Sequence, residues 1–568
     1  MTFGRKAVAL WAVAGTAVIS FVWAADEMDG PTQGPQAMAP SGLPSEESTP
    51  EVDRELRVGG WRAATCAMPP ELLQRTLRGY YKGRSPEITF VPEEPHFFGD
   101  FKTTTTHSGP WDYVQTVPLV LYGPGHIRSR GEVNLDREVT IADLAPTFAR
   151  LLGIGFPGAR PGRALTEALV PKDERPGRPR LIITVVWDGG GVNTLAQWPK
   201  TWPNLRRFMA EGTSFSGAIV GSNPSVTPAI HANLGTGAFP NRHGIVSIPQ
   251  RRRDRIEDSW SGHSPRNLLI KTLADIYDPT TGNRARIGLL AEQDWHLGMI
   301  GNGAAIRGGD RDIAVLTRTS PFETNPRYYR LPGYIQNVPG FKADVETIDR
   351  SDGKNNGKWL GHDLPKDRST GFANPAWTLY QERLLRKLLK EEGFGRDRVP
   401  DLFFTNFKQI DEVSHAYFLR STEMKSTIPY SDAALARLVR WLNRNVGERR
   451  WVLAMTADHG VGPNFTDVGA WAIDMQELQI DIAIHFRTRV SELFDSQRPQ
   501  GFWVDRAVLR RKGITRAEIA NFLLGYRIRD NVADDLKVPD GYREMMDGRL
   551  FTAAWPTEAI TSMSDCRS

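Results

Sequence analysis

The stretch LIITVVWDGGG, Leu181 to Gly191, indicates the class of fold. Its apolar and β-branched residues run without a break to Asp188, and glycines follow. Continuous rather than alternating hydrophobicity predicts a strand that is buried on both faces of a mostly parallel sheet. Other stretches show the same rhythm of strand-like and then helix-like runs: 116–123, 401–407, 451–458, 141–154 and 430–446. We therefore expect an α/β fold in which helices flank a mostly parallel central sheet.

The composition is that of an ordinary globular protein. With 568 residues, 40% of them hydrophobic and 24% charged, the chain has room for one large catalytic domain with an insertion, or for two or three smaller domains. The net charge of +5 comes from scattered arginines, and no basic stripe interleaved with aromatic residues accompanies the dense run at 251–255. We expect that run to be a solvated loop, and we expect no nucleic-acid partner.

The N-terminal segment predicts export. A basic start, MTFGRK, leads into an apolar run that ends before Asp26. Residues 1–25 are therefore a signal peptide or an uncleaved membrane anchor, and both alternatives stay open because the run is near the length of a membrane span. Residues 26–52 are rich in Pro, Gly, Ser and acids, which predicts a disordered linker. We expect an extracellular or cell-envelope protein, attached to the membrane if the segment is not cleaved.

Acidic residues stand where predicted strands end. Asp188 ends one strand, and Asp458 with His459 ends another. In open α/β sheets ligands bind at the carboxyl ends of the strands, although Asp is also a common loop and helix-capping residue. A carboxylate beside an imidazole suits a zinc-type site. Asp411 and His415 are four residues apart, so on a helical turn they share one face and can bind one ion.

A threonine precedes a predicted helix. Thr227 stands directly before Pro228, which is favoured in the first turn of a helix, so we expect Thr227 at the N-cap of a helix that runs toward Gly237. The exposed N–H groups at that end favour an alkoxide and a bound phosphate oxygen. A plain structural N-cap is the alternative.

The order of these motifs resembles one family. Asp188 at a strand end, PSVTPAIHANLGTG with FPNRHGI, IDEVSH and TADHG together resemble the alkaline phosphatase superfamily, in its phosphodiesterase and nucleotide pyrophosphatase branch and the related single-threonine phosphatases. The resemblance implies that Thr227 is the nucleophile that becomes phosphorylated. It implies that a first metal is held by Asp188, Thr227, Asp458 and His459, and that Asp411 and His415 are two of three ligands of a second metal. Sulfatase chemistry is disfavoured, because the sulfatases of this superfamily have a Cys or Ser at the position where this chain has Thr227.

The third histidine of the second metal stands at the front of the chain. The segments HSGPWDYVQTVPLVLYGPG and IADLAPTFARLLGI resemble the part that closes the chain in relatives, which makes His107 the missing ligand. We infer a circular permutation, with the old ends joined near 171–180. In the unpermuted order Ser568 would lead into residues 60–80, so Cys66 and Cys566 should be neighbours and a disulfide is favoured over two free thiols.

The resemblance also implies a division of the chain. The expected parts are a permuted C-terminal part of the catalytic domain at 53–170, a joining linker at 171–180, a core with the nucleophile at 181–250, a cap subdomain at 251–395 and the rest of the core at 396–568. The family's Asn after HGI is absent here. Asn406, Lys408 and Asn233 are the candidates for substrate binding, whereas His231 and His243 are assigned to structure.

These observations together predict an exported phosphoric ester hydrolase with two divalent metal ions and a small phosphorylated substrate. The mixture of Asp and His ligands favours zinc, with manganese and iron as alternatives. A phosphomonoesterase and a phosphodiesterase or nucleotide pyrophosphatase are both compatible with the motifs. A phosphonate hydrolase of the same superfamily, or an inactive exported binding protein on this fold, are the rivals.

Overall fold

The computed structural model describes residues 60–99, 106–533 and 536–566. The predicted signal peptide or anchor and the predicted linker lie outside these residues. Within the described ranges, no helix is both long enough and apolar enough to cross a membrane.

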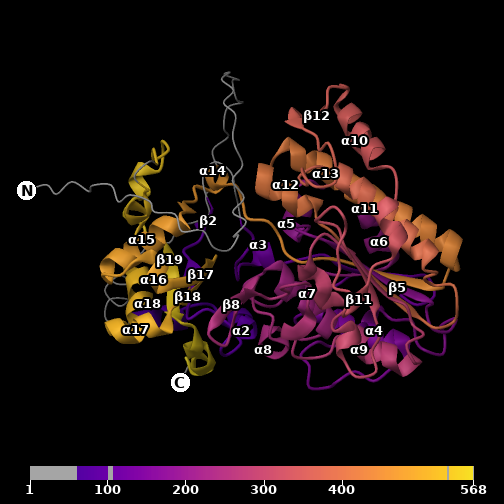
Figure 1. The fold of residues 1–568 in the computed structure, drawn as a ribbon, viewed down its shortest axis with the longest axis horizontal. Coiled ribbons are helices and arrows are strands. Elements are labelled where there is room, and N and C mark those ends of the chain that lie inside the picture. Colours follow the sequence, from indigo (N-terminus) through magenta and orange to yellow (C-terminus); the bar gives the residue numbers. More distant parts are fainter. Residues whose placement is uncertain (1–59, 100–105, 534–535, 567–568) are drawn as a thin grey trace, which may run out of the picture. The chain divides into compact units, whose positions relative to one another are not determined.

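A nine-stranded sheet forms the centre of the molecule (Figure 1). In spatial order its strands are β11 (Tyr329–Arg330), β10 (Asp312–Leu316), β9 (Ile287–Ala291), β14 (Asp401–Phe407), β5 (Leu181–Trp187), β15 (Trp451–Ala457), β3 (Leu119–Tyr122), β6 (Thr213–Phe215) and β4 (Gly131–Val133). From β11 to β15 every pair is parallel, and β3 is antiparallel to both of its neighbours. The predicted α/β class with a mostly parallel central sheet is confirmed.

The strand that begins at Leu181 is buried on both faces, as its sequence predicts. Ile182 and Val186 pack into one hydrophobic core, and Ile183 and Val185 pack into the other. One face is covered by α4 (Leu144–Leu152), α7 (Thr227–Thr236) and α9 (Leu273–Tyr277). The other is covered by α6 (Pro203–Glu211), α11 (Ala376–Glu391) and α13 (Thr422–Leu442).

Part of the stretch 251–395, which we expect from the sequence to be a cap subdomain, belongs to the central sheet. Its strands β9, β10 and β11 extend the central sheet beyond β14. The reason is that IGLLA and DIAVL are short apolar runs of the same kind as β5, and both are fully buried. The remainder of the stretch contributes α10 (Phe341–Asp349), β12 (Lys358–Trp359), β13 (His362–Asp363) and α11.

A second, antiparallel sheet combines both ends of the described chain. Its order is β17 (Phe494–Arg498), β18 (Gly501–Val504), β1 (Ile88–Pro92) and β19 (Phe551–Pro556), so an early strand lies between two late ones (Figure 1). The helices α15 (Met475–His485), α17 (Arg506–Lys512) and α18 (Arg516–Gly525) contribute to its core. Cys66 and Cys566 form a disulfide, with their Cα atoms 5.4 Å apart.

The remaining elements are short, apart from α2 and α12. They are α2 (Pro70–Gly79), β2 (Phe97–Phe98), α3 (Asp112–Gln115), α5 (Val192–Gln197), α8 (Pro240–His243), β7 (Pro249–Arg252), β8 (Arg255–Asp258), α12 (Gln409–Tyr417), α14 (Phe465–Val468), β16 (Ala472–Ile473) and α16 (Val490–Leu493). The basic run at 251–255 forms the β7–β8 hairpin, and its residues 252–255 are exposed as expected, whereas Arg251 is not. Arg251 is buried there, and its guanidinium donates to both carboxylate oxygens of Glu87 at 3.0 Å.

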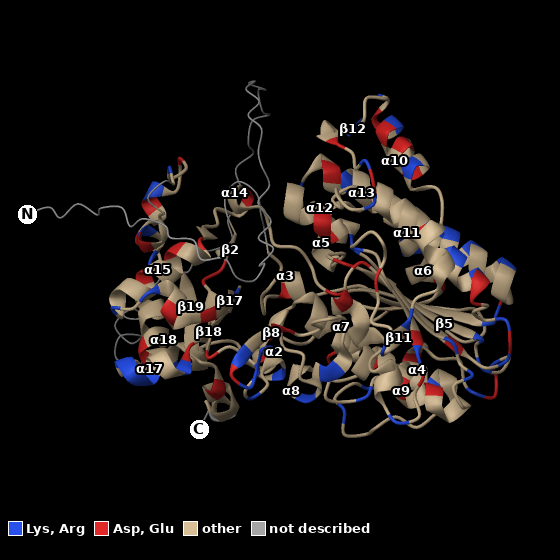
Figure 2. Cartoon of the chain, viewed as in Figure 1, with Lys and Arg blue, Asp and Glu red and all other residues tan. Residues whose placement is uncertain are grey.

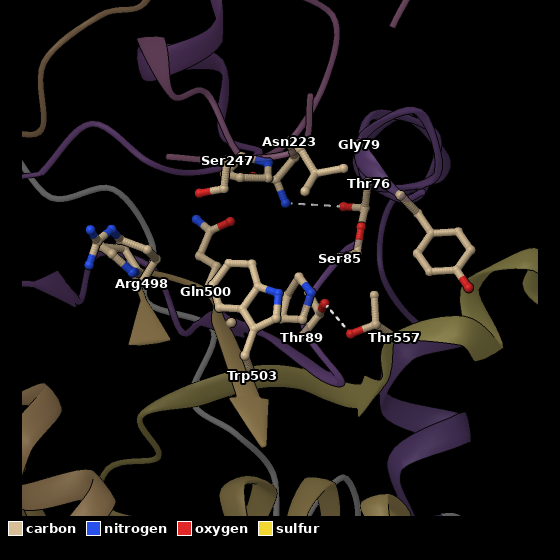
Figure 3. A pocket seen from close by; sticks show the side chains of 16 residues that line it. Thr76, Gly79, Ser85, Thr89, Asn223, Ser247, Arg498, Gln500, Trp503 and Thr557 are labelled. Carbon is tan, nitrogen blue, oxygen red and sulfur yellow. Dashed lines mark hydrogen bonds between the residues drawn. The ribbon is translucent and has the colours of Figure 1, made fainter. Parts of the chain in front are cut away.

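A pocket lies where α2 and the second sheet meet the segment that precedes α7. Figure 3 shows Asn223 and Ser247 across this pocket from Gln500 and Trp503. The Asn223 amide donates to the Thr76 hydroxyl of α2 at 3.3 Å. Gly79, the last residue of α2, approaches the main chain of Asn223 so closely that a Cβ atom would lie 1.7 Å from its carbonyl oxygen.

We expect Gly79→Ala to destabilise the protein, because the added methyl meets main-chain atoms that cannot turn aside. Overpacking of this kind costs about 1–3 kcal/mol of unfolding free energy, measured by urea unfolding followed through tryptophan fluorescence. The matched control is Gly525→Ala, which also changes the last residue of a helix but finds no atom within 4 Å. Equal stability of the two variants would contradict the close approach at Gly79.

Candidate functional site

The acids predicted at strand ends meet at one edge of the central sheet. Strands β14, β5 and β15 are adjacent and parallel, and Phe407, Trp187 and Ala457 are in register. The next residues along each strand are Lys408, Asp188 and Asp458. Parallel pairing thus carries three charged side chains to the same level, at the edge where open α/β sheets bind ligands. Acidic positions lie here between α7 and α12 (Figure 2).

One group of candidate metal ligands is Asp188, Asp411 and His459. The His459 Nε2 atom lies 3.3 Å from Asp188 Oδ1, 3.4 Å from Asp458 Oδ2 and 4.0 Å from Asp411 Oδ1. All four side chains are buried. The His459 Nε2, Asp458 Oδ2 and Asp411 Oδ1 atoms have no hydrogen-bond partner among the described residues. Buried, unpaired donor atoms that converge in this way fit a bound cation.

A second group is His107, Asp411 and His415. The His415 Nε2 atom is 3.3 Å and the His107 Nε2 atom 3.8 Å from Asp411 Oδ1. Asp411 and His415 project from the same face of α12, and the His107 ring stacks on the His459 ring with 3.4 Å between centroids. Asp411 therefore joins the two groups, and a histidine far away in the sequence completes the second.

Main-chain carbonyl groups orient these imidazoles. The Nδ1 atom of His107 lies 3.0 Å from the carbonyl oxygen of Ser225, and that of His459 lies 2.9 Å from the carbonyl oxygen of Gly460. Only a protonated ring nitrogen can donate to a carbonyl oxygen, so Nδ1 carries a hydrogen and Nε2 is the nitrogen that faces the carboxylates and that a metal ion would bind. Metal-binding histidines in proteins usually have this arrangement.

Thr227 differs by one position from the expected N-cap. Val226 is the N-cap of α7, and Thr227 is the first helical residue, with its side chain buried. No side-chain capping bond is made at this helix start. The Thr227 carbonyl oxygen is 2.8 Å from Nδ1 of His231, which in turn lies 3.9 Å from Asp458 Oδ2. The nucleophile candidate is thereby tied to the ligand candidates through His231.

Lys408 connects the two groups electrostatically. Its ammonium donates to Asp188 Oδ1 at 2.8 Å and to Asp411 Oδ2 at 2.6 Å. Burial would lower the pKa of Lys408, but Asp188 and Asp411 hold it well above its usual value. Burial would likewise raise the pKa of Asp188 and of Asp411, yet Lys408 and the nearby imidazoles hold both well below the usual range.

The remaining carboxylate, Asp458, forms no ion pair with a lysine among the described residues. Burial, followed by the charge of Asp188, raises the pKa of Asp458 to about 7. Burial would lower the pKa of the adjacent His459, whereas Asp458 and Asp188 raise it to about 9. The metal-free cluster thus carries more negative charge than Lys408 alone balances, and it attracts protons or cations.

The two asparagines predicted to bind substrate are already engaged. Asn406 donates from Nδ2 to Asp188 Oδ2 at 3.0 Å, so it supports a ligand candidate. Asn233 donates to the Ser222 hydroxyl at 2.9 Å, and its Oδ1 atom lies 2.8 Å from His243 Nε2. These contacts of Asn233 hold the segment before Thr227, and its role in substrate binding stays a prediction.

Sequence reasoning missed one histidine at the site. His296 lies in the short 3-10 helix η5 (Asp294–Met299), and its Nε2 atom is 3.5 Å from Asp188 Oδ2. Asp188 follows β5 directly, whereas His296 lies in η5, beyond the end of β9. Recognising β9 as part of the central sheet would have drawn attention to the segment after this strand.

A family profile and two curated relatives indicate the alkaline phosphatase superfamily. A sequence profile described as type I phosphodiesterase / nucleotide pyrophosphatase matches residues 182–547, which contain every candidate ligand except His107. Alkaline phosphatase PhoV of Synechococcus elongatus is 22% identical over 332 residues, which are 50% of this chain and 59% of PhoV. Alkaline phosphatase PafA of Elizabethkingia meningoseptica is 32% identical over 103 residues, 18% of each chain. The chain therefore spans less than two thirds of these relatives.

A solved structure resembles part of the chain. The crystal structure of wild-type alkaline phosphatase PafA has 16% sequence identity and a TM-score of 0.46, and the match covers 66% of this chain and 84% of that chain.

We expect Lys408→Met to destabilise chiefly the metal-free protein, because it leaves Asp188 and Asp411 buried without a cation. Removing one partner of a buried ion pair costs about 3–5 kcal/mol. Urea unfolding with a chelator should show this loss, and unfolding with excess zinc should show a smaller one, since bound cations replace the missing charge.

The control is Lys387→Met, which removes the exposed pair with Glu391 at 3.0 Å and should cost about 0.5 kcal/mol or less. A loss at Lys408 that is the same with and without zinc would contradict the role of its charge.

Proposed function

The chain belongs to the type I phosphodiesterase / nucleotide pyrophosphatase family of the alkaline phosphatase superfamily, and on that premise we propose that it is a metal-dependent phosphoric ester hydrolase that acts through Thr227. The observation that carries the proposal is the meeting of a buried and a partly buried ligand group that share Asp411, beside the helix that begins with Thr227.

The donor sets fit two divalent cations. Asp188, Asp458 and His459 with the Thr227 hydroxyl would hold the first, and Asp411, His415 and His107 the second. Carboxylates mixed with imidazoles favour zinc, with manganese and iron as further candidates. When bound, such ions lower the pKa of the nucleophile and balance charge on the phosphoryl oxygens and on the leaving oxygen.

Two displacements at phosphorus complete the proposed reaction. Thr227 Oγ1 gives its hydrogen to solvent and forms a bond to phosphorus, while the bond to the leaving alcohol oxygen breaks and that oxygen takes a proton from solvent. A water molecule then attacks the phosphothreonine and releases phosphate, with the hydroxyl of Thr227 restored. The first N–H groups of α7 and the ammonium of Lys408 favour the negative charge of the phosphoryl group.

The front segment supports our proposal of a circular permutation. The family profile begins at residue 182, whereas His107 and the strands β1, β3 and β4 precede it. These early strands pair with later ones: β3 with β15, and β1 with β19. Export likewise remains a proposal, supported by the basic and apolar start of the sequence.

We expect Thr227→Ala to lower kcat by about 10⁴-fold or more, since loss of a nucleophile removes the covalent route. The assay uses zinc-loaded protein with p-nitrophenyl phosphate and with bis-p-nitrophenyl phosphate, and mass spectrometry of quenched wild-type protein should find phosphate on the peptide that contains Thr227. The control is Thr347→Ala, which removes an exposed threonine hydroxyl on α10 and should leave both rates unchanged.

Two outcomes would contradict this proposal in different ways. If zinc-loaded wild-type protein turns over neither ester, the proposed activity is wrong. If Thr227→Ala keeps the wild-type rate, the activity stands and the nucleophile is another group.

We expect His107→Ala to reduce bound zinc from two ions to one per chain, because the second group then keeps only Asp411 and His415. Metal content is measured by elemental mass spectrometry after dialysis. The control is His485→Ala, which changes an exposed histidine and should retain both ions. Two ions in both variants would show that His107 is not a ligand.

A further inference from the structure

We propose that His296 is an additional metal ligand, which binds through Nε2 a cation that it shares with Asp188. The inference rests on the proposed function only in so far as Asp188 holds a metal. Neither the sequence motifs nor the family resemblance assign a role to His296.

The His296 ring presents a free lone pair in a fully buried setting. The side chain has no exposed surface, and its Nδ1 atom lies 2.7 Å from the carbonyl oxygen of Gln293. Nδ1 must therefore carry the hydrogen, which leaves Nε2 as an acceptor. Nε2 has no hydrogen-bond partner anywhere in the part of the chain that the structure describes. His107 and His459 are oriented by carbonyl groups in the same way.

The distance to Asp188 is that of two ligands of one ion. Two atoms about 2.0–2.1 Å from a tetrahedral cation are about 3.3 Å apart. The His296 Nε2 and Asp188 Oδ2 atoms are 3.5 Å apart, close to the 3.3 Å between His459 Nε2 and Asp188 Oδ1 and the 3.3 Å between His415 Nε2 and Asp411 Oδ1. An acceptor nitrogen that faces a carboxylate oxygen at this distance is repelled unless a cation or a proton lies between them.

The two oxygens of Asp188 have different surroundings. Oδ1 receives the ammonium of Lys408 and faces His459, whereas Oδ2 receives the amide of Asn406 and faces His296. No lysine or arginine forms an ion pair with Oδ2 among the described residues. The Oδ2 side of Asp188 is thus the side on which a bound cation would find a carboxylate oxygen and an imidazole without a competing ammonium.

Close packing fixes His296 against the nucleophile helix. In η5, a Cβ atom added to Gly298 would lie 2.7 Å from the main-chain nitrogen of Ala232, and one added to Gly235 would lie 2.1 Å from the carbonyl oxygen of Gly298. These contacts join η5 to α7, which also carries His231, whose ring meets that of His296 edge to face with 4.6 Å between centroids. The imidazole is therefore held in place before any metal binds, as a ligand requires.

The test compares zinc and cobalt binding by chelator-stripped full-length protein with His296→Ala and His296→Gln. We expect the affinity for at least one zinc ion, measured by titration calorimetry, to fall by about 100-fold in both variants, since loss of a direct ligand should exceed the 10–100-fold effect of outer-shell changes. The visible absorption of the cobalt(II) protein should also change, because it reports the number of ligands. His296→Gln keeps a side chain of similar size and serves if His296→Ala does not fold.

The control is His126→Ala, which removes another fully buried histidine with one unpartnered ring nitrogen. Its Nε2 atom lies 2.9 Å from the carbonyl oxygen of Arg449. It forms no ion pair with a carboxylate within the described ranges, so metal binding should stay as in the wild type.

The outcomes separate this inference from the proposed function. If both His296 variants are folded and match His126→Ala in zinc affinity and cobalt spectrum, His296 is not a ligand and the inference is wrong. If they bind zinc more weakly while wild-type protein hydrolyses no ester, the ligand assignment holds and the proposed function is wrong.

Discussion

Three carboxylates are buried within a few ångströms of one another, and the rest of the site depends on how their charge is balanced. Asp188, Asp411 and Asp458 are each at most 2% exposed. Burying an isolated carboxylate is costly, so such groups require cations or donors nearby. Lys408 supplies one positive charge, and the imidazoles of His107, His459 and His415 converge on the same oxygens. Metal ions bound among these side chains would supply further positive charge and stabilise the cluster.

Parallel pairing explains why these residues can meet at all. Strands β14, β5 and β15 are in register, so the residue after each strand reaches the same level. Each of the three strands is buried throughout, and this burial holds the register against slippage. Asp411 and His415 lie in the first turns of α12, which begins directly after Lys408. The side chains of the site are thus positioned by strand ends and by this helix rather than by long loops.

The sequence predicts this part of the molecule well, because continuous apolar runs and strand-end acids are local signals. The α/β class follows from them, and the order of the motifs resembles the family that the sequence profile identifies. Other features depend on contacts that no local pattern contains. His296 lies after a strand that is only five residues long, and Arg251 lies in a basic run that reads as solvent-exposed until Glu87 is placed beside it. Asn233 carries a side-chain amide of the kind that can bind a substrate, but this amide is hydrogen-bonded to Ser222 and His243.

The segment 222–226 links the distant parts of the chain to Thr227, the proposed nucleophile. On one side the hydroxyl of Ser225 donates to the carbonyl oxygen of His107 at 2.7 Å, and the carbonyl oxygen of Ser225 orients the His107 ring. On the other side Gly79 of α2 packs directly on Asn223. Thr227 directly follows this segment. A shift of the residues around His107 would therefore move both His107 and Thr227. Such coupling keeps a site assembled from separate stretches of sequence in a single geometry, which catalysis by positioned groups requires.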